Sequence, residues 1–254
     1  MKTPFDRLEQ QFGILRSQAM YYWNPFQRQK LIRFYQQFIP KGSLCFDIGA
    51  HLGNRLDAWL TFDSQIVALD PQPLCYRYLQ RHFGKKSNVT ILPVAAGREL
   101  GKMDLHVSHL YPTVSTLSGN KWRKALNDAS EASVTWDETV EVEVTTLDLL
   151  IEKYGLPYFC KIDVEGFETK VLKGLTQPIP MLSFEFLSTR QKSRVTCLKH
   201  LNSLGDYTYN WSEGDSYQLE LEKWVDANVL LENIRRKGNQ LFSGDIYARR
   251  LKVD

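Results

Sequence analysis

The chain has 254 residues, of which 43% are hydrophobic and 24% charged, and its formal net charge is +3. This length and apolar content allow a full core, so we expect one large domain or one domain with an appendage. The basic clusters are short, which argues against a nucleic-acid partner. No apolar stretch reaches the roughly 18 residues that span a bilayer, so no membrane span is expected. The N-terminus lacks the apolar region of an export signal, and we expect a cytoplasmic protein with four reduced cysteines.

The first forty residues predict a helix that begins near Pro25. Asn24 can cap this helix and Pro25 can take its first position, and the apolar residues that follow recur at helical spacing. We therefore expect a helical extension over residues 1–42, beside a domain that covers residues 43–254.

From residue 44 onward, strand and helix signals alternate. The predicted strands are 44–47, 66–70, 89–94, 140–145, 159–163, 181–186, 207–211 and 245–249. The predicted helices between them are 54–61, 72–83, 147–153, 165–172 and 189–204. Such alternation indicates right-handed βαβ crossovers and a parallel sheet in an α/β fold. The pattern changes after Gly97, where residues 102–108 and 113–117 suggest short strands, so an insertion is expected at about 98–139.

Four of the apolar runs carry an acid at or near their end, namely Asp47, Asp70, Asp163 and Glu185. If these runs are parallel strands, the acids gather along the carboxyl edge of one sheet, where open α/β proteins bind ligands. An anionic rim there suits a ligand that has hydroxyl groups and a positive charge.

Residues 47–54 join the first strand to the first helix, and Asp70 ends the second strand about twenty residues after the turn, as expected for a ribose-binding acid. A dinucleotide site needs a second glycine where this chain has His51, which weakens an NAD-dependent oxidoreductase. S-adenosyl-L-methionine has a ribose but no phosphates, so its site tolerates a side chain there. Gly49 would let the chain pass close to the cofactor, and Gly53 would let the helix pack on the sheet. A plain tight turn remains the alternative.

The chain resembles the FkbM family of S-adenosylmethionine-dependent methyltransferases over about residues 25–250. The matching segments are residues 46–54, 70–71, 144–148, 161–168, 171–174 and 183–185. The resemblance implies a Rossmann-like seven-strand sheet with an antiparallel last strand and helices on both faces. It also implies O-methylation of saccharides or small natural products. It implies cofactor roles for Asp47, Gly49, Gly53 and Asp70, and places Asp163 in the active-site cleft. Within the same segments we count Ala50, Asn54 and Pro71 among the cofactor-binding residues.

A charged pair, Lys161 and Asp163, points to one side of an otherwise apolar strand. Such a pair must be compensated or lie at an opening, because burial of an unpaired charge is costly. With Glu185 on the next strand, it would form either a catalytic cluster or a buried ion-pair network. Asp163 is the first candidate for a base or an orienting group, followed by Glu165, Glu185 and His51. Glu165 is also expected to open a helix and contact its dipole.

Other residues have both a functional and a structural interpretation. Ala95 and Ala96 follow the third strand, where they could border the adenine or simply pack closely. His51 could contact the ligand or make a helix-entry hydrogen bond. His106 and His109 do not share a face of a strand, so no metal site is expected. A noncatalytic protein of the same fold remains possible from the sequence, which does not predict the oligomeric state.

Overall fold

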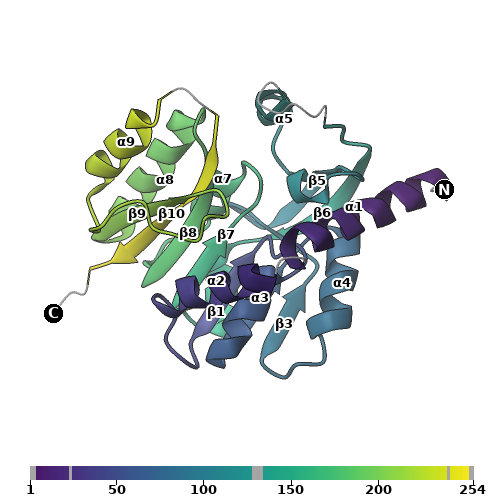
Figure 1. Ribbon diagram of the computed structural model, residues 1–254, viewed down its shortest axis with the longest axis horizontal. Coiled ribbons are helices and arrows are strands. Elements are labelled where there is room, and N and C mark those ends of the chain that lie inside the picture. Colours follow the sequence, from purple (N-terminus) through teal and green to yellow (C-terminus); the bar gives the residue numbers. More distant parts are fainter. Residues whose placement is uncertain (1–3, 23–24, 128–133, 239–240, 252–254) are drawn as a thin grey trace.

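The computed structural model describes residues 4–22, 25–127, 134–238 and 241–251 (Figure 1). Its centre is a seven-stranded sheet in the order β3-β2-β1-β7-β8-β10-β9. The strands are β1 (Leu44–Ile48), β2 (Gln65–Leu69), β3 (Val89–Leu92), β7 (Phe159–Ile162), β8 (Met181–Leu187), β9 (Tyr207–Glu213) and β10 (Ser243–Arg250). β10 pairs antiparallel with β8 and β9, whereas the inner pairs are parallel. The predicted α/β fold, Rossmann-like with an antiparallel last strand, is confirmed.

Helices cover both faces of this sheet and make a three-layered molecule (Figure 1). One face is covered by α6 (Leu147–Tyr154), α7 (Glu168–Leu172), α8 (Gln191–Leu204) and α9 (Ala227–Arg236). The other face is covered by α2 (Pro25–Gln36), α3 (Asn54–Trp59) and α4 (Pro73–Phe83). Phe46 and Ile48 of β1 face the first group and Cys45 faces the second, because successive side chains alternate along a strand. Asp47 therefore points toward α2 and α3.

A second sheet consists of β4 (Ala95–Ala96), β6 (Glu138–Thr145) and β5 (Gly101–Val107), in the order β4-β6-β5, and of these strands β5 lies within the predicted insertion. The predicted strand at 140–145 exists, but it belongs to this sheet and does not extend the main one. The predicted strand at 113–117 is wrong, because η2 (Pro112–Val114) and a single bridge from Thr116 to His106 stand there. A short helix, α5 (Asn120–Asn127), follows.

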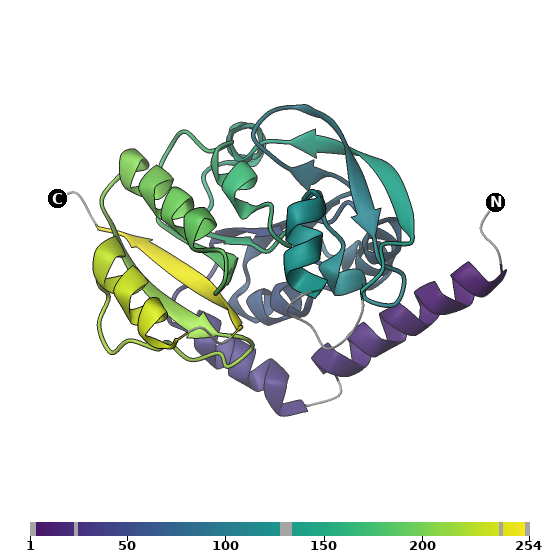
Figure 2. The ribbon, with the colours of Figure 1, turned by 90° about the horizontal axis from the view of Figure 1, so that it is seen from above.

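The N-terminal segment contains one helix more than the sequence predicts. α2 begins at Pro25 as expected, while its proposed cap, Asn24, lies outside the described residues. Before it, α1 (Pro4–Tyr22) extends along one side of the molecule (Figure 2). A side chain at Gly13 of α1 would overlap the His109 carbonyl and reach Pro112 at 3.0 Å, so α1 packs directly on the insertion. The division of the chain at residue 42 stays a prediction.

Within the described residues, no helix is both long and apolar enough to cross a bilayer. The four cysteines, Cys45, Cys75, Cys160 and Cys197, are free thiols in buried positions, as the sequence predicts. Burial raises the pKa of the Cys45 thiol to about 12. Such a thiol stays protonated near neutral pH and packs as a small apolar group.

Candidate active site

The loop after β1 passes close to the end of β7. Gly49 has φ +87°, and a side chain there would overlap the backbone carbonyl of Asp163. Its N–H donates to the Leu69 carbonyl at 2.9 Å, which ties the loop to the end of β2. Only glycine combines this left-handed backbone with so close an approach. Gly49 thus brings together three neighbouring strand ends.

Gly53 ends the same loop, with φ +79°. A Cβ atom at this position would lie 2.8 Å from Phe83 and 2.9 Å from Leu79, which both belong to α4. The expectation that Gly53 lets the helix pack on the sheet is therefore wrong in its detail. This glycine lets the loop pack against α4.

Asp70 connects the loop to β2. Its Oδ2 accepts the backbone N–H of His51 at 2.8 Å, and its Oδ1 accepts that of Gln72 at 2.9 Å. Each carboxylate oxygen keeps a second lone pair for another donor. Burial raises the pKa of Asp70 to about 7, although the two N–H groups act in the opposite direction. The glycine turn and the ribose-binding candidate are therefore neighbours.

The loop from Gly49 to Gly53 that follows β1, here called the glycine loop, borders a cavity that we call the loop cavity. The other walls of the loop cavity are the ends of β2 and β7, β4 and the insertion. Of the predicted cofactor-binding residues, seven line it: Gly49, His51, Asp70, Pro71, Ala95, Ala96 and Asp163. Glu165 lines it as well, and so does Tyr21 of α1. Ser115 and Thr116 of the insertion form a further wall. The structure thus gathers these residues, which are widely separated in the sequence, around one space.

Four predicted cofactor-binding residues do not line the loop cavity: Asp47, Ala50, Gly53 and Asn54. Ala50 packs in the core between the sheet and α2 and α3. The Oδ1 of Asn54 accepts the N–H of Arg55 at 2.9 Å, at the start of α3. Asp47 is buried, and its Oδ2 has no partner among the described residues. Burial raises the pKa of Asp47 to about 6.

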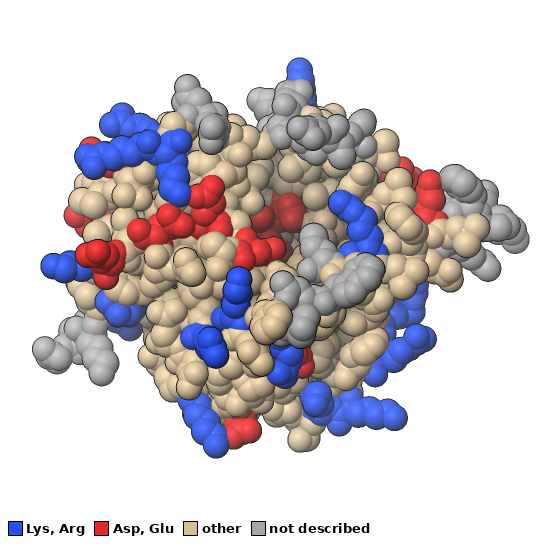
Figure 3. Space-filling model, in the orientation of Figure 1, with Lys and Arg blue, Asp and Glu red and all other residues tan. Residues whose placement is uncertain are grey.

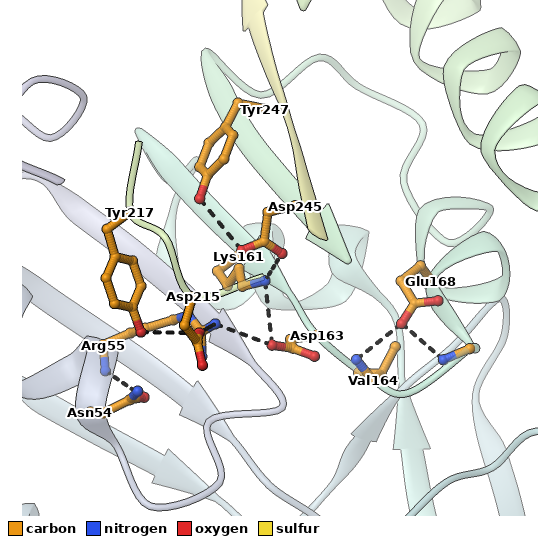
Figure 4. A network of polar contacts seen from close by, with 11 residues as sticks. Asn54, Arg55, Lys161, Asp163, Val164, Glu168, Asp215, Tyr217, Asp245 and Tyr247 are labelled. Carbon is orange, nitrogen blue, oxygen red and sulfur yellow. Dashed lines mark hydrogen bonds and ion pairs between the residues drawn. The ribbon is translucent and has the colours of Figure 1, made fainter. Parts of the chain in front are cut away.

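Lys161 is the centre of a buried ionic network (Figure 4). Its side chain is fully buried, and its Nζ contacts Asp245 and lies 3.4 Å from Asp163 Oδ2. Arg55 approaches the same Asp163 oxygen at 3.5 Å and Asp215 at 4.0 Å. Although burial alone would raise it, the positive charges of Lys161 and Arg55 lower the pKa of Asp163. Asp163 is therefore a carboxylate held in its ionised form.

Two further acids lie beside Asp163. One carboxylate oxygen each of Asp163, Glu165 and Glu185 lies within 4.8 Å of the others, so the predicted approach of Asp163 to Glu185 is present. Burial, together with the neighbouring carboxylates, raises the pKa of Glu165 and of Glu185 well above the usual range. The three carboxyl groups of this cluster therefore cannot all be ionised at the same time.

The expectation that Glu165 opens a helix is wrong. Glu165 has φ 54° and Gly166 has φ +88°, and this left-handed turn delays the start of α7 to Glu168. The Glu168 Oε1 accepts the N–H of Val164 at 3.2 Å and that of Gly166 at 3.1 Å (Figure 4). Glu168 therefore fixes the turn after β7, and Glu165 is left to line the cavity.

A second cavity of about 120 Å³ adjoins the loop cavity; we call it the acidic cavity. The two cavities share the walls made by Tyr21, Arg55, Asp163 and Glu165. Glu185, Asp215 and Asp245 line the acidic cavity and not the loop cavity. Figure 3 shows acidic side chains gathered on this face and inside its hollow. A molecule in the acidic cavity would therefore lie next to a ligand in the loop cavity, in a negative environment.

His51 presents a neutral ring to the loop cavity. Burial lowers its pKa to about 4, and the ring packs edge-on against Tyr21 with centroids 5.6 Å apart. Neither ring nitrogen has a hydrogen-bond partner among the described residues, so no helix-entry hydrogen bond is formed by the side chain.

The two histidines of the insertion have structural contacts. His109 Nε2 lies 2.9 Å from Gln10 Nε2 of α1 and 3.1 Å from Glu138 Oε2, and His106 Nδ1 lies 3.4 Å from the Thr139 hydroxyl. Neither ring belongs to a cluster of three potential metal ligands in the described part of the chain. The prediction that no metal is bound stays a prediction.

The sequence matches the model of the methyltransferase FkbM domain over residues 47–209. The chain belongs to this family. The FkbM match runs from the second half of β1 into β9, and it includes both the glycine loop and the turn after β7. Family membership makes the protein a methyltransferase of the S-adenosylmethionine-dependent class. No curated protein sequence has a significant match to the chain.

Solved structures of other methyltransferases are similar to the FkbM chain at low identity. One is the precorrin-6y C5,15-methyltransferase from Geobacter metallireducens, with 10% identity, 88% of this chain and 87% of that chain covered, and a TM-score of 0.46. Another is a TehB-like SAM-dependent methyltransferase from Corynebacterium glutamicum, with 10% identity, coverages of 87% and 88%, and a TM-score of 0.44. The family assignment rests on the family model.

Three charged residues of this site, Arg55, Asp215 and Asp245, were not predicted from the sequence. Asp245 faces Glu185 across the pairing of β10 with β8, and an acid near the start of the last predicted strand was the available signal. Arg55 follows Asn54 in the first turn of α3, at a position whose environment depends on β7 and on the segment after β9. No local pattern distinguishes it from a solvated helix residue.

Proposed function

We propose that this FkbM protein transfers a methyl group from S-adenosyl-L-methionine to a hydroxyl oxygen of a saccharide or small natural product. The observation that supports it best is the arrangement of Gly49, Asp70 and Asp163 around one cavity. Asp70 would accept the ribose hydroxyls through its remaining lone pairs. Ala95 and Ala96 would border the adenine, and the other end of the ligand would reach His51 and Asp163. The residues present fit this cofactor.

When bound, the cofactor supplies an electrophilic methyl group on a cationic sulfur. The protein's own contribution is to hold the acceptor hydroxyl in line with that methyl group, which can account for much of the rate. Asp163, kept ionised by Lys161 and Arg55, would accept a hydrogen bond from the hydroxyl and orient it. Burial and the neighbouring carboxylates raise the pKa values of Glu185 and Glu165, so whichever of the two is ionised is a stronger base than an ordinary carboxylate and can take up the proton. Lys161 is fully buried and acts through Asp163 as a positioning residue.

The acidic cavity is the proposed acceptor site because it adjoins the loop cavity beside Asp163. Hydroxyl groups can donate to its carboxylates, which suits a saccharide or another polyhydroxylated molecule. The same acids would repel a phosphate backbone, so no nucleic-acid acceptor is proposed. An NAD-type oxidoreductase is disfavoured because the His51 ring lines the cavity where a dinucleotide needs the backbone to approach.

Isothermal titration calorimetry tests the proposal. We expect the folded protein to bind both S-adenosylmethionine and its demethylated product, S-adenosylhomocysteine. Heat from NAD and none from these two compounds would contradict it. Methyl transfer from labelled cofactor to a panel of saccharides then separates an enzyme from a noncatalytic binding protein of the same fold.

A further inference from the structure

Arg55 is the one Lys or Arg among the described residues that line the two cavities, and it borders both. Two acids of the shared region, Asp163 and Glu165, and one acid of the acidic cavity, Asp215, lie around it. Figure 4 shows the guanidinium between Asp215 and Asp163. The loop cavity therefore has a single basic side chain, placed at the end opposite to Ala95 and Ala96 in the proposed cofactor orientation.

The guanidinium is incompletely partnered. Its ion pairs are long, 3.5 Å to Asp163 and 4.0 Å to Asp215, whereas charge-assisted hydrogen bonds are usually about 2.7–2.9 Å. The side chain is 13% exposed, and its Nε is buried with no hydrogen bond of good geometry in the described part of the chain, although the buried Tyr35 hydroxyl lies near enough to interact with the guanidinium. A buried donor without a partner is costly. Since the guanidinium of Arg55 already lost most of its water when the protein folded, an anionic group that reaches it can form hydrogen bonds without paying that desolvation cost again.

The proposed cofactor carries one anionic group, the carboxylate of its amino-acid end. If Asp70 holds the ribose, that end extends toward His51, Arg55 and Asp163, which line the remaining part of the cavity. A carboxylate and a guanidinium form two parallel hydrogen bonds when they meet in plane. The neighbouring Asp163 has the opposite charge and suits the ammonium group of the same amino-acid end.

We propose that Arg55 binds the α-carboxylate of S-adenosylmethionine and thereby selects adenosyl compounds that retain it. The inference rests on the proposed function and adds a binding residue to it. Arg55 is then a determinant of cofactor specificity, and a part of the ionic network that the sequence did not reveal.

The test is calorimetric and uses two probes: S-adenosylmethionine and decarboxylated S-adenosylmethionine, which lacks only the carboxylate. The unaltered protein should bind the first at least about 10-fold more tightly than the second. Arg55→Gln should weaken binding of S-adenosylmethionine by about 10-fold to 100-fold and leave the decarboxylated compound within about 3-fold. Arg55→Lys should lie between, because an ammonium keeps the charge but not the planar fork.

Equal affinity of the unaltered protein for both probes overturns the role of Arg55 and leaves the proposed function standing. Equal weakening of both probes by Arg55→Gln overturns it as well. Binding of neither probe by the unaltered protein overturns the proposed function and this inference together. The comparison of probes on the unaltered protein needs no variant, so it can overturn the role of Arg55 even if Arg55→Gln unfolds, and Arg55→Lys then assigns any preference to this side chain.

Discussion

Replacement of Lys161 by methionine tests the buried ionic network. Lys161→Met keeps the length of the side chain but removes the cation that Asp163 and Asp245 share. Removal of one partner from a buried ion pair costs about 3–5 kcal/mol, because the remaining charges stay buried. The side chains of Asp163 and Asp245 are only 19% and 10% exposed, so water can do little to stabilise their charges once Lys161 is removed. We expect a loss of that size in the free energy of unfolding near pH 7.

The stability cost of Lys161→Met should depend on pH in a definite direction. In the unaltered protein the pKa of Asp163 is lowered, so its stabilising contribution is complete above the unfolded pKa of about 3.9 and is lost as the pH falls through the folded value. In Lys161→Met burial would dominate and raise that pKa. Protonation of Asp163 then stabilises the variant as the pH falls. The difference in the free energy of unfolding between the unaltered protein and the variant therefore becomes smaller from neutral pH toward about pH 4.

Urea unfolding at pH 7.5 and pH 5 measures both effects. Lys102→Met is the matched control, because Lys102 is paired with Glu141 at 2.9 Å on the exposed face of β5. Surface pairs contribute little, so this control should unfold almost as the unaltered protein does. A cost for Lys161→Met below about 1 kcal/mol, or one that does not narrow at pH 5, would refute the network as described.

Three other substitutions examine the proposed site. Asp70→Asn should lower the affinity for S-adenosylhomocysteine about 10-fold by calorimetry, whereas the exposed Asp104→Asn should not change it; equal affinities would count against Asp70. Gly42→Ala is the control for Gly49→Ala, because Gly42 also has a left-handed backbone but a Cβ atom there would meet no other atom, so this variant should cost only about 1–2 kcal/mol of backbone strain. Gly49→Ala should lower the melting temperature further and abolish binding, because its Cβ would overlap the end of β7; matching melting curves would argue against the close approach. Glu185→Gln should slow methyl transfer about 100-fold and leave cofactor affinity within about 2-fold, since Glu185 lines the acidic cavity and not the loop cavity; unchanged turnover excludes it as a proton acceptor.

The strands of the main sheet could be predicted because they are short apolar runs with nearby turn signals. The run at residues 44–47 forms β1, and the pairing of its end with β2 and β7 brings Asp70 and Asp163 toward the glycine loop. Once a parallel sheet is inferred, proximity at the carboxyl edge follows from topology alone. This explains why residues separated by more than a hundred positions could be assigned to one site.

The features that could not be predicted depend on contacts distant in the sequence. β6 has a strand pattern, but its partner is β5 of the insertion, and the pattern does not specify which sheet a strand joins. α7 begins at Glu168 and not at the predicted Glu165, because Gly166 adopts a left-handed conformation that the Glu168 side chain stabilises. The position of Arg55 depends on Asp163 and Asp215, which lie far along the chain.

A crystal structure with S-adenosylhomocysteine bound would test the central claim most directly. The account predicts both ribose hydroxyls within hydrogen-bond distance of the Asp70 carboxylate, with the amino-acid end of the ligand beside the Gly49 loop. A ligand bound elsewhere on the molecule, or one whose ribose does not contact Asp70, would contradict it.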